Sequence, residues 1–289
     1  MKHFAKRVLW GTYRTPDETN QLDIENMVAA TPQDPTRFKM GRAIVALMLR
    51  EMSSTYGRSS MGYFWALAEP IGGIAFLTVI FSLALRSPSI GDSFALYYAT
   101  GMLPMQLFTQ TSNKTAASIK FSKALLGYPR VTFVDAIIAR ITLNSLTHFV
   151  ISFVLIGGMV IISPSFVFLN VPQMALAFMM AVSLALGFGM MNCFLFWRVP
   201  VWKQLWGILT RPLFLISGVL YNFEDLPQNA QDILWYNPVV HVIGQMRMGV
   251  FATYEPTYIS YIYVFGLSIT FTALGLVLLK RYYNDIMFK

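Results

Sequence analysis

The chain has 289 residues, of which 55% are hydrophobic and only 12% charged, and its formal net charge is +8 at pH 7. Soluble domains carry about 25% charged residues, so most of this surface faces something other than water. The composition favours an all-α integral membrane protein over a soluble nucleic-acid-binding protein, and the single cysteine excludes a disulfide framework or a cysteine metal cluster.

The leader before the first apolar stretch divides into two parts. Residues 1–40 are polar and rich in proline toward their end, which predicts a cytoplasmic extension that is partly flexible. Residues 41–62 place apolar side chains among Arg42, Arg50, Glu51 and Arg58, a pattern typical of an amphipathic helix lying in the membrane interface. A short cytoplasmic helix with one solvated face is the alternative.

The rest of the chain, residues 63–289, predicts one domain with six transmembrane helices. A helix needs about 20 mostly apolar residues to cross a bilayer. Six stretches satisfy this rule or nearly do: residues 64–85, 94–112, 141–162, 171–196, 201–220 and 258–279.

Lys and Arg side chains are concentrated on one side of this predicted topology. Of the 22 Lys and Arg residues, 19 lie in the leader, in the second-to-third and fourth-to-fifth connections, and in the tail. Because cytoplasmic loops of membrane proteins carry the excess of Lys and Arg, we expect both chain termini in the cytoplasm.

Two connections are longer than a simple turn requires. Residues 113–126 form an amphipathic stretch on the cytoplasmic side. Residues 221–256 form an outer segment, and its best apolar run, residues 233–243, is too short to cross the membrane. This outer segment therefore predicts re-entrant or interfacial helices before the last crossing.

Two charged residues within or beside the predicted crossings are functional candidates, because a charge is costly in the bilayer. Glu69 stands near the start of the first crossing, where a solvated interface carboxylate is the alternative. Arg211 lies deeper, and it offers a positive charge either to an anionic substrate or to Glu69. Tryptophans gather near the predicted cytoplasmic ends, where they indicate an aromatic belt or rings that contact a sugar chain.

Catalytic motifs are missing from the sequence. It contains no G-x-x-x-x-G-K-[ST] phosphate loop, no H-E-x-x-H motif and no cysteine pair. The chain is therefore not expected to be an enzyme by itself. His148 falls in the third crossing, where a hydrogen-bonded histidine facing the bundle is the simpler interpretation.

Four stretches, in order and at compatible spacing, resemble KpsM-type permeases, the membrane subunits of ABC transporters that export capsular polysaccharide. The similarity runs from about residue 43 to the end of the chain. The stretches are Leu49-Arg50-Glu51 with Gly62-Tyr63-Phe64-Trp65 and Glu69-Pro70, Tyr128-Pro129-Arg130-Val131, Arg211-Pro212-Leu213-Phe214, and Trp235-Tyr236-Asn237-Pro238 with His241.

The resemblance implies a six-span homodimer in a bacterial inner membrane, surrounded by membrane lipids. Two copies of a separate cytoplasmic ATPase would bind ATP and Mg²⁺, so no cofactor is expected in this chain. The cargo would be a lipid-linked acidic polysaccharide, handed on to periplasmic and outer-membrane export proteins, and no nucleic acid is expected as a partner.

The same resemblance suggests roles for individual residues. The substrate path would include Glu69, Arg211, Trp65, Trp202, Trp206, Phe214 and Tyr221. Residues 113–126 would be the coupling helix, with Arg50, Arg58, Lys114, Lys120 and Lys123 coupling the ATPase. The outer segment would contribute Trp235, Asn237, His241 and Arg247. The family often carries a glutamate three residues after the histidine that matches His241, and this chain has Gly244 there.

Three alternatives remain open. The same architecture would serve another cargo, such as O-antigen, teichoic acid or a drug. An ATP-independent lipid or sugar flippase would need membrane-embedded carboxylates and usually internal repeats, and neither is evident. A glycolipid-modifying enzyme would use Asp135, His148 or His241, but the predicted topology places Asp135 and His241 on opposite sides of the membrane.

Overall fold

The structure, a computed structural model, describes residues 39–55, 62–126, 132–162 and 169–288. The described residues from Met40 onward belong to one compact unit. The predicted extension over residues 1–40 therefore lies almost entirely outside the described residues, as do Arg58 and the rest of the segment 56–61.

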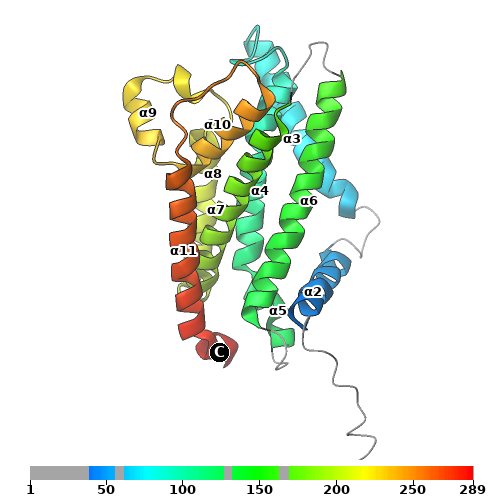
Figure 1. Ribbon diagram of the computed structural model, residues 1–289, viewed down its shortest axis with the longest axis vertical. Helices are drawn as coiled ribbons and strands as arrows, with labels where there is room; N and C mark the ends of the chain where they lie inside the picture. Colours follow the sequence, from blue (N-terminus) through cyan, green and yellow to red (C-terminus); the bar gives the residue numbers. More distant parts are fainter. Residues whose placement is uncertain (1–38, 56–61, 127–131, 163–168, 289) are drawn as a thin grey trace, which may run out of the picture. The chain divides into compact units, whose positions relative to one another are not determined.

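The described residues form eleven α-helices and one short 3-10 helix, and they contain no β-strand (Figure 1). The helices in chain order are α2 (Lys39–Thr55), α3 (Gly62–Ala84), α4 (Phe94–Ala116), α5 (Ser118–Leu126), α6 (Phe133–Ile162), α7 (Val171–Arg198), α8 (Pro200–Ile216), η2 (Phe223–Asp225), α9 (Gln228–Leu234), α10 (Pro238–Val250), α11 (Tyr261–Arg281) and α12 (Tyr283–Phe288).

Four helices are long and apolar enough to cross a membrane by length and composition. They are α3 over Phe64–Ala84, α6, α7 and α11. The other two predicted crossings are also helical, but α4 carries many polar side chains and α8 has only 17 residues. Length and composition thus support four crossings, and the crossing of the membrane by α4 and α8 stays a prediction.

Helix α7 lies at the centre of the bundle, where it packs most extensively on α4 and α11 and also contacts α10. Small residues let these backbones approach closely. A Cβ added at Gly187 of α7 would lie 2.7 Å from the Ser268 carbonyl oxygen, and one at Gly275 of α11 would lie 2.9 Å from the Met190 carbonyl carbon. Close packing of small residues is a main source of helix association in membranes, where lipid is as apolar as the helices.

The helix boundaries differ from the predicted ones for local reasons. Helix α6 begins at Phe133 rather than near Ile141 because Thr132 and Asp135 form a capping box. Thr132 Oγ1 accepts a hydrogen bond from the Asp135 N–H at 3.2 Å, and Asp135 Oδ2 accepts one from the Thr132 N–H at 2.9 Å. The predicted helix over residues 113–126 is shared between the end of α4 and the separate helix α5, with the break at Ala117.

The outer segment contains the short helix η2 and the two α-helices α9 and α10. Asn237 interrupts the apolar run 233–243 between α9 and α10. It caps α10, with its Oδ1 accepting a hydrogen bond from the Val239 N–H at 3.1 Å, and Pro238 is the first residue of α10. Helices α9 and α10 lie at one end of the unit, and α5 and α12 lie at the other (Figure 1). We call these the α10 end and the α5 end.

Candidate functional site

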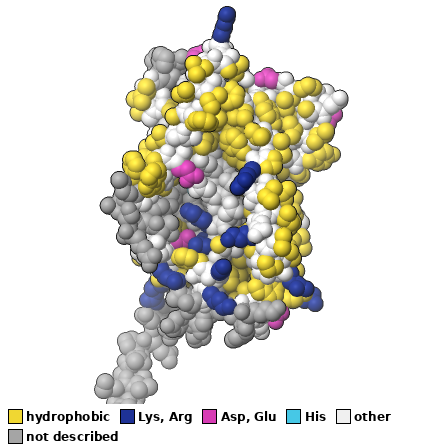
Figure 2. Space-filling view, turned by 180° about the vertical axis from the view of Figure 1, so that it is seen from behind, with side chains coloured by type: hydrophobic (Ala, Val, Ile, Leu, Met, Phe, Trp, Pro, Cys, Tyr) yellow, Lys and Arg dark blue, Asp and Glu magenta, His cyan; other side chains and the backbone are white. Residues whose placement is uncertain are grey.

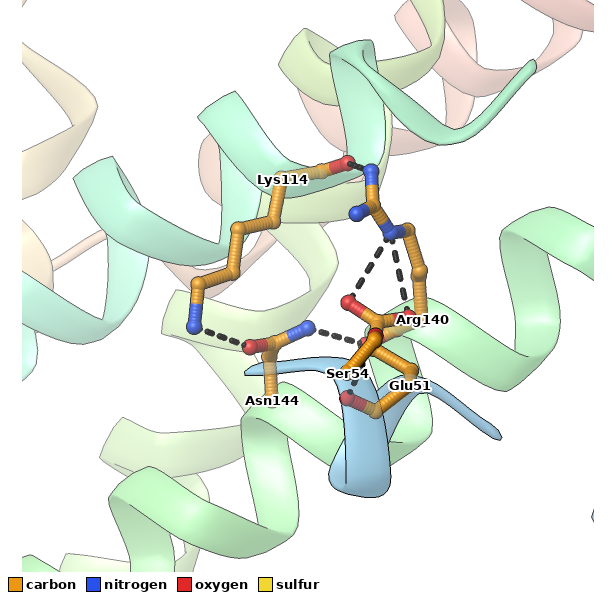
Figure 3. Close-up of polar contacts among 5 residues, drawn as sticks. All are labelled: Glu51, Ser54, Lys114, Arg140 and Asn144. Atoms are coloured by element: carbon orange, nitrogen blue, oxygen red, sulfur yellow. Dashed lines mark hydrogen bonds and ion pairs between the residues drawn. The ribbon is translucent and has the colours of Figure 1, made fainter. Parts of the chain in front are cut away.

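A buried polar junction at the α5 end links α2, α4 and α6 (Figure 3). The Arg140 Nε of α6 donates to both carboxylate oxygens of Glu51 in α2, at 2.9 and 3.1 Å. The Arg140 Nη1 donates to the Lys114 carbonyl oxygen of α4 at 2.8 Å. Only 5% of Glu51 and 7% of Arg140 is exposed. Buried charges are tolerated only when paired, so this pair fixes α2 against the bundle.

Asn144 and Phe121 complete the junction. The Lys114 Nζ donates to Asn144 Oδ1 at 2.6 Å, and Asn144 Nδ2 donates to the Arg140 carbonyl at 2.7 Å. The Arg140 guanidinium lies 4.3 Å from the ring centroid of Phe121 in α5, and Arg50 lies 5.4 Å from the same centroid. Helices α2, α4, α5 and α6 are thus linked through a few side chains.

Glu51, Arg140 and Asn144 are not among the functional residues predicted from the sequence. One signal was available for Glu51: it lies four residues after Leu47, so it shares a helix face with a buried leucine. A carboxylate on the buried face of an amphipathic helix requires a cation. The identity of that cation, 89 residues further along the chain, is a tertiary fact.

Helix α8 has no buried residue along its 17 residues, and its main contact is with α7. Two tryptophans one turn apart attach it to its neighbours. The Trp202 indole N–H donates to Asn192 Oδ1 of α7, and the Trp206 indole N–H donates to Asn113 Oδ1 of α4, both at 2.9 Å. Most other side chains of α8 are exposed within one copy of the chain.

The other candidate path residues are not gathered into one site. Glu69 is exposed on α3, and its Oε1 accepts a hydrogen bond from Gln110 Nε2 at 3.1 Å. Arg211 is exposed on α8, and within the described residues it forms no ion pair with Glu69. Trp65 is exposed on α3, whereas Phe214 and Tyr221 are half-buried. Lys and Arg side chains nevertheless gather across the lower half of one face of the molecule (Figure 2).

The candidate coupling residues lie around α5. Lys114 and Arg50 take part in the junction, and Lys120 and Lys123 are exposed on α5 itself. Arg58 falls among residues that the structure does not describe.

Of the outer-segment candidates, Trp235 and His241 lie in contact at the α10 end, with their ring centroids 5.2 Å apart. His241 is fully buried, its Nδ1 accepts the Ser260 N–H at 3.2 Å, and its Nε2 lies 2.9 Å from the Trp235 carbonyl oxygen. A neutral imidazole with the proton on Nε2 satisfies both bonds. Burial is the main cause that lowers the pKa of His241. The Trp235 indole in turn donates to the Tyr258 carbonyl at 3.0 Å.

Arg247 is 1% exposed and supports the turn after α8. Its Nη1 donates to the Tyr221 carbonyl at 2.9 Å and its Nη2 to the Val219 carbonyl at 3.2 Å, while its guanidinium lies 4.2 Å from the Tyr97 ring centroid. The structure also explains Gly244. A side chain there would collide with the phenol of Tyr258, whose Cζ would lie 2.9 Å from the new Cβ.

The residues considered for catalysis have structural partners instead. Asp135 caps α6, and His241 bridges Trp235 and Ser260. His148 is buried in α6. In the segments that the structure describes, no group of three His, Cys, Asp or Glu residues is placed to hold a metal ion.

The fold and these clusters define a helical integral membrane protein in which the described polar clusters connect helices. Residues 42–251, well over half of the chain, match the ABC-2 type transporter family, and the chain belongs to that family.

Curated relatives match most of the chain at low identity. The polysialic acid transport protein KpsM of Escherichia coli is 28% identical over 235 residues, which cover 81% of this chain and 91% of that protein. The capsule polysaccharide export inner-membrane protein BexB of Haemophilus influenzae is 27% identical over 262 residues, which cover 88% and 97%. The O-antigen export system permease protein RfbA of Klebsiella pneumoniae is 24% identical over 246 residues, which cover 81% and 90%.

Proposed function

We propose that this chain is the membrane-spanning permease subunit of an ATP-driven ABC exporter, and that its cargo is a lipid-linked acidic capsular polysaccharide. The family match supports the permease role, and the relatives named for capsule polysaccharide export and polysialic acid transport support this cargo. The Klebsiella relative supports O-antigen as a second candidate cargo, at lower identity.

The structural observation that carries the proposal is the incompletely covered helix α8. This 17-residue helix has no buried residue and carries Arg211 and two tryptophans. A single copy of the chain would leave it exposed to lipid, where a charged side chain is costly. A second copy of the chain would cover it and enclose a path between the two. Exposed cations would then balance an acidic polymer, and flat aromatic rings would contact sugars of any sequence.

Two copies of a separate ATPase are proposed to dock at the α5 end, each binding ATP and Mg²⁺. Helix α5 is the proposed docking element, with Lys120 and Lys123 exposed on it. Closure of the ATPases would displace α5, and the junction around Glu51 and Arg140 would pass that displacement to α2, α4 and α6.

The proposed topology has six crossings of a bacterial inner membrane and both termini in the cytoplasm. The distribution of Lys and Arg supports this orientation. The α10 end would then face outward, where periplasmic and outer-membrane export proteins would take over the cargo.

The experiment has two readouts. The chain is purified from native membranes in mild detergent, and co-purifying proteins are identified by mass spectrometry. Its gene is also deleted, and lipid-linked polysaccharide is measured inside the cells and at their surface. A stoichiometric ATPase together with polysaccharide retained inside the deletion strain is the expected result. A chain that purifies alone, or a deletion strain with normal surface polysaccharide, would contradict the proposal.

A further inference from the structure

A cavity of about 770 Å³ lies at the α5 end, between the ends of α4 and α7, α5, α8 and α12. Its volume falls within the roughly 300–1,000 Å³ that small-molecule sites occupy. Three exposed lysines line it, Lys120 and Lys123 from α5 and Lys203 from α8, so it is accessible from the aqueous phase.

The charged side chains that line the cavity in the described part of the chain are all cationic. Among those described residues, no Asp or Glu lines it. Three ammonium groups around one cavity repel one another, and a bound anion relieves that repulsion. The cavity therefore favours an anionic ligand.

Asn113 adds a donor to the same wall. The Trp206 indole N–H can only donate, so the Asn113 amide oxygen Oδ1 must be the acceptor and faces the Trp206 ring. The two N–H groups of Nδ2 have no protein partner among the described residues. Asn113 thus offers donors to a ligand that accepts hydrogen bonds, as a phosphate does.

The remaining wall is apolar and aromatic. It includes the Trp206 and Trp197 rings and Phe196, with Cys193 beside them. Such rings present flat apolar faces, against which the C–H groups of a sugar or the first carbons of a lipid chain can pack. A free inorganic ion would leave this part of the wall without contacts.

We propose that this cavity binds the phosphate-bearing head group of the lipid-linked cargo, with its first sugar against the tryptophans, before transport. This inference rests on the proposed function. The three lysines of the wall suit a phosphate, which lysine binds as a point charge.

Lys203 separates this role from ATPase docking. Lys120 and Lys123 belong to the helix proposed to contact the ATPase, so substituting them alone does not distinguish the two roles. Lys203 lies on α8, across the cavity from α5. Lys280 is an exposed cation of α11 that does not line the cavity, and it provides the matched control.

The test measures binding to the full chain, purified with its ATPase, in lipid nanodiscs. The probes are dodecyl phosphoglucose, dodecyl phosphate, glucose 1-phosphate, inorganic phosphate and the uncharged dodecyl glucoside. Dodecyl phosphoglucose should bind most tightly. Lys203→Gln should weaken the binding of dodecyl phosphoglucose by about fivefold, and Lys280→Gln should leave it unchanged. The triple variant that combines Lys120→Gln, Lys123→Gln and Lys203→Gln should weaken that binding by about 100-fold. Size-exclusion profiles and melting temperatures confirm that each variant is folded.

Four outcomes decide the question. Weaker binding by Lys203→Gln with normal ATPase co-purification supports the head-group site. Inorganic phosphate that binds as tightly as dodecyl phosphoglucose overturns the lipid-linked ligand. Lysine substitutions that release the ATPase but leave probe binding unchanged overturn the site in favour of a docking surface. No probe binding by a complex that retains its ATPase and exports cargo overturns this inference alone, and the proposed function stands.

Discussion

Glu51 of α2 and Arg140 of α6 are 89 residues apart in the chain, yet the Arg140 Nε lies 2.9 and 3.1 Å from the two Glu51 carboxylate oxygens. Glu51→Gln leaves Arg140 buried without a counter-charge, so we expect a loss of about 3–5 kcal/mol in the free energy of unfolding. Thermal unfolding of the purified chain in detergent measures it. Glu69→Gln, which changes an exposed carboxylate, is the control, and equal losses from the two substitutions would contradict a buried ion pair.

The indole of Trp202 is expected to hold α8 against α7. Trp202→Phe removes the donor to Asn192 Oδ1, and Asn192 Nδ2 already lacks a partner within the described residues. A buried amide left without any partner costs about 1–3 kcal/mol. Trp65→Phe, at an exposed indole, should leave the melting temperature nearly unchanged. If both variants melt alike, the bond to Asn192 is not a stabilising one.

Gly244 is expected to tolerate no side chain. Gly244→Ala places a methyl group against the Tyr258 phenol, so it should destabilise the chain by about 1–3 kcal/mol. Gly157 in α6 has no atom within 4 Å of an added Cβ, and Gly157→Ala should be neutral or stabilise the helix by about 0.5–1 kcal/mol. The difference between their melting temperatures is the measurement, and its absence would show that Tyr258 moves aside freely.

The stability of the α10 end should fall in acid because of His241. Its pKa is lowered by burial, so the unfolded chain binds a proton more readily than the folded one. The contribution of the neutral ring is complete above about pH 6.5, the ordinary histidine pKa, and is lost progressively as the pH falls below it. The melting temperature of the wild type should therefore drop more between pH 8 and pH 5.5 than that of His241→Gln. Parallel drops would argue against this assignment.

Export should depend on the two exposed charges assigned to the path. Arg211→Ala and Glu69→Ala are expected to lower polysaccharide export by roughly fivefold or more while insertion into the membrane stays normal. Surface polysaccharide and the amount of permease in membranes are measured together. Arg86→Ala, at an exposed loop cation between α3 and α4, is the matched control. Normal export by both path variants would remove them from the path.

The class of the protein follows from the sequence by itself, because apolar stretches of about 20 residues and the placement of Lys and Arg are local properties. All six predicted apolar stretches are helical over most of their length, and the resemblance carried by short stretches such as Arg211-Pro212 agrees with the family match. The exact helix limits depended on caps such as Thr132 with Asp135, whose geometry is visible only once the backbone is placed.

Only the tertiary structure decided which residues meet. Glu51 pairs with Arg140, Trp206 bonds to Asn113, and Gly244 packs against Tyr258. The two residues of each pair lie on separate segments, so the spacing of residues in the sequence does not connect them. The cavity lined by Lys120 and Lys203 arises in the same way, since α5 and α8 come from separate parts of the chain and form one wall only in the folded bundle. The spacing of apolar residues in the sequence indicates which face of a helix is buried. Which residue that face contacts depends on how several helices pack together.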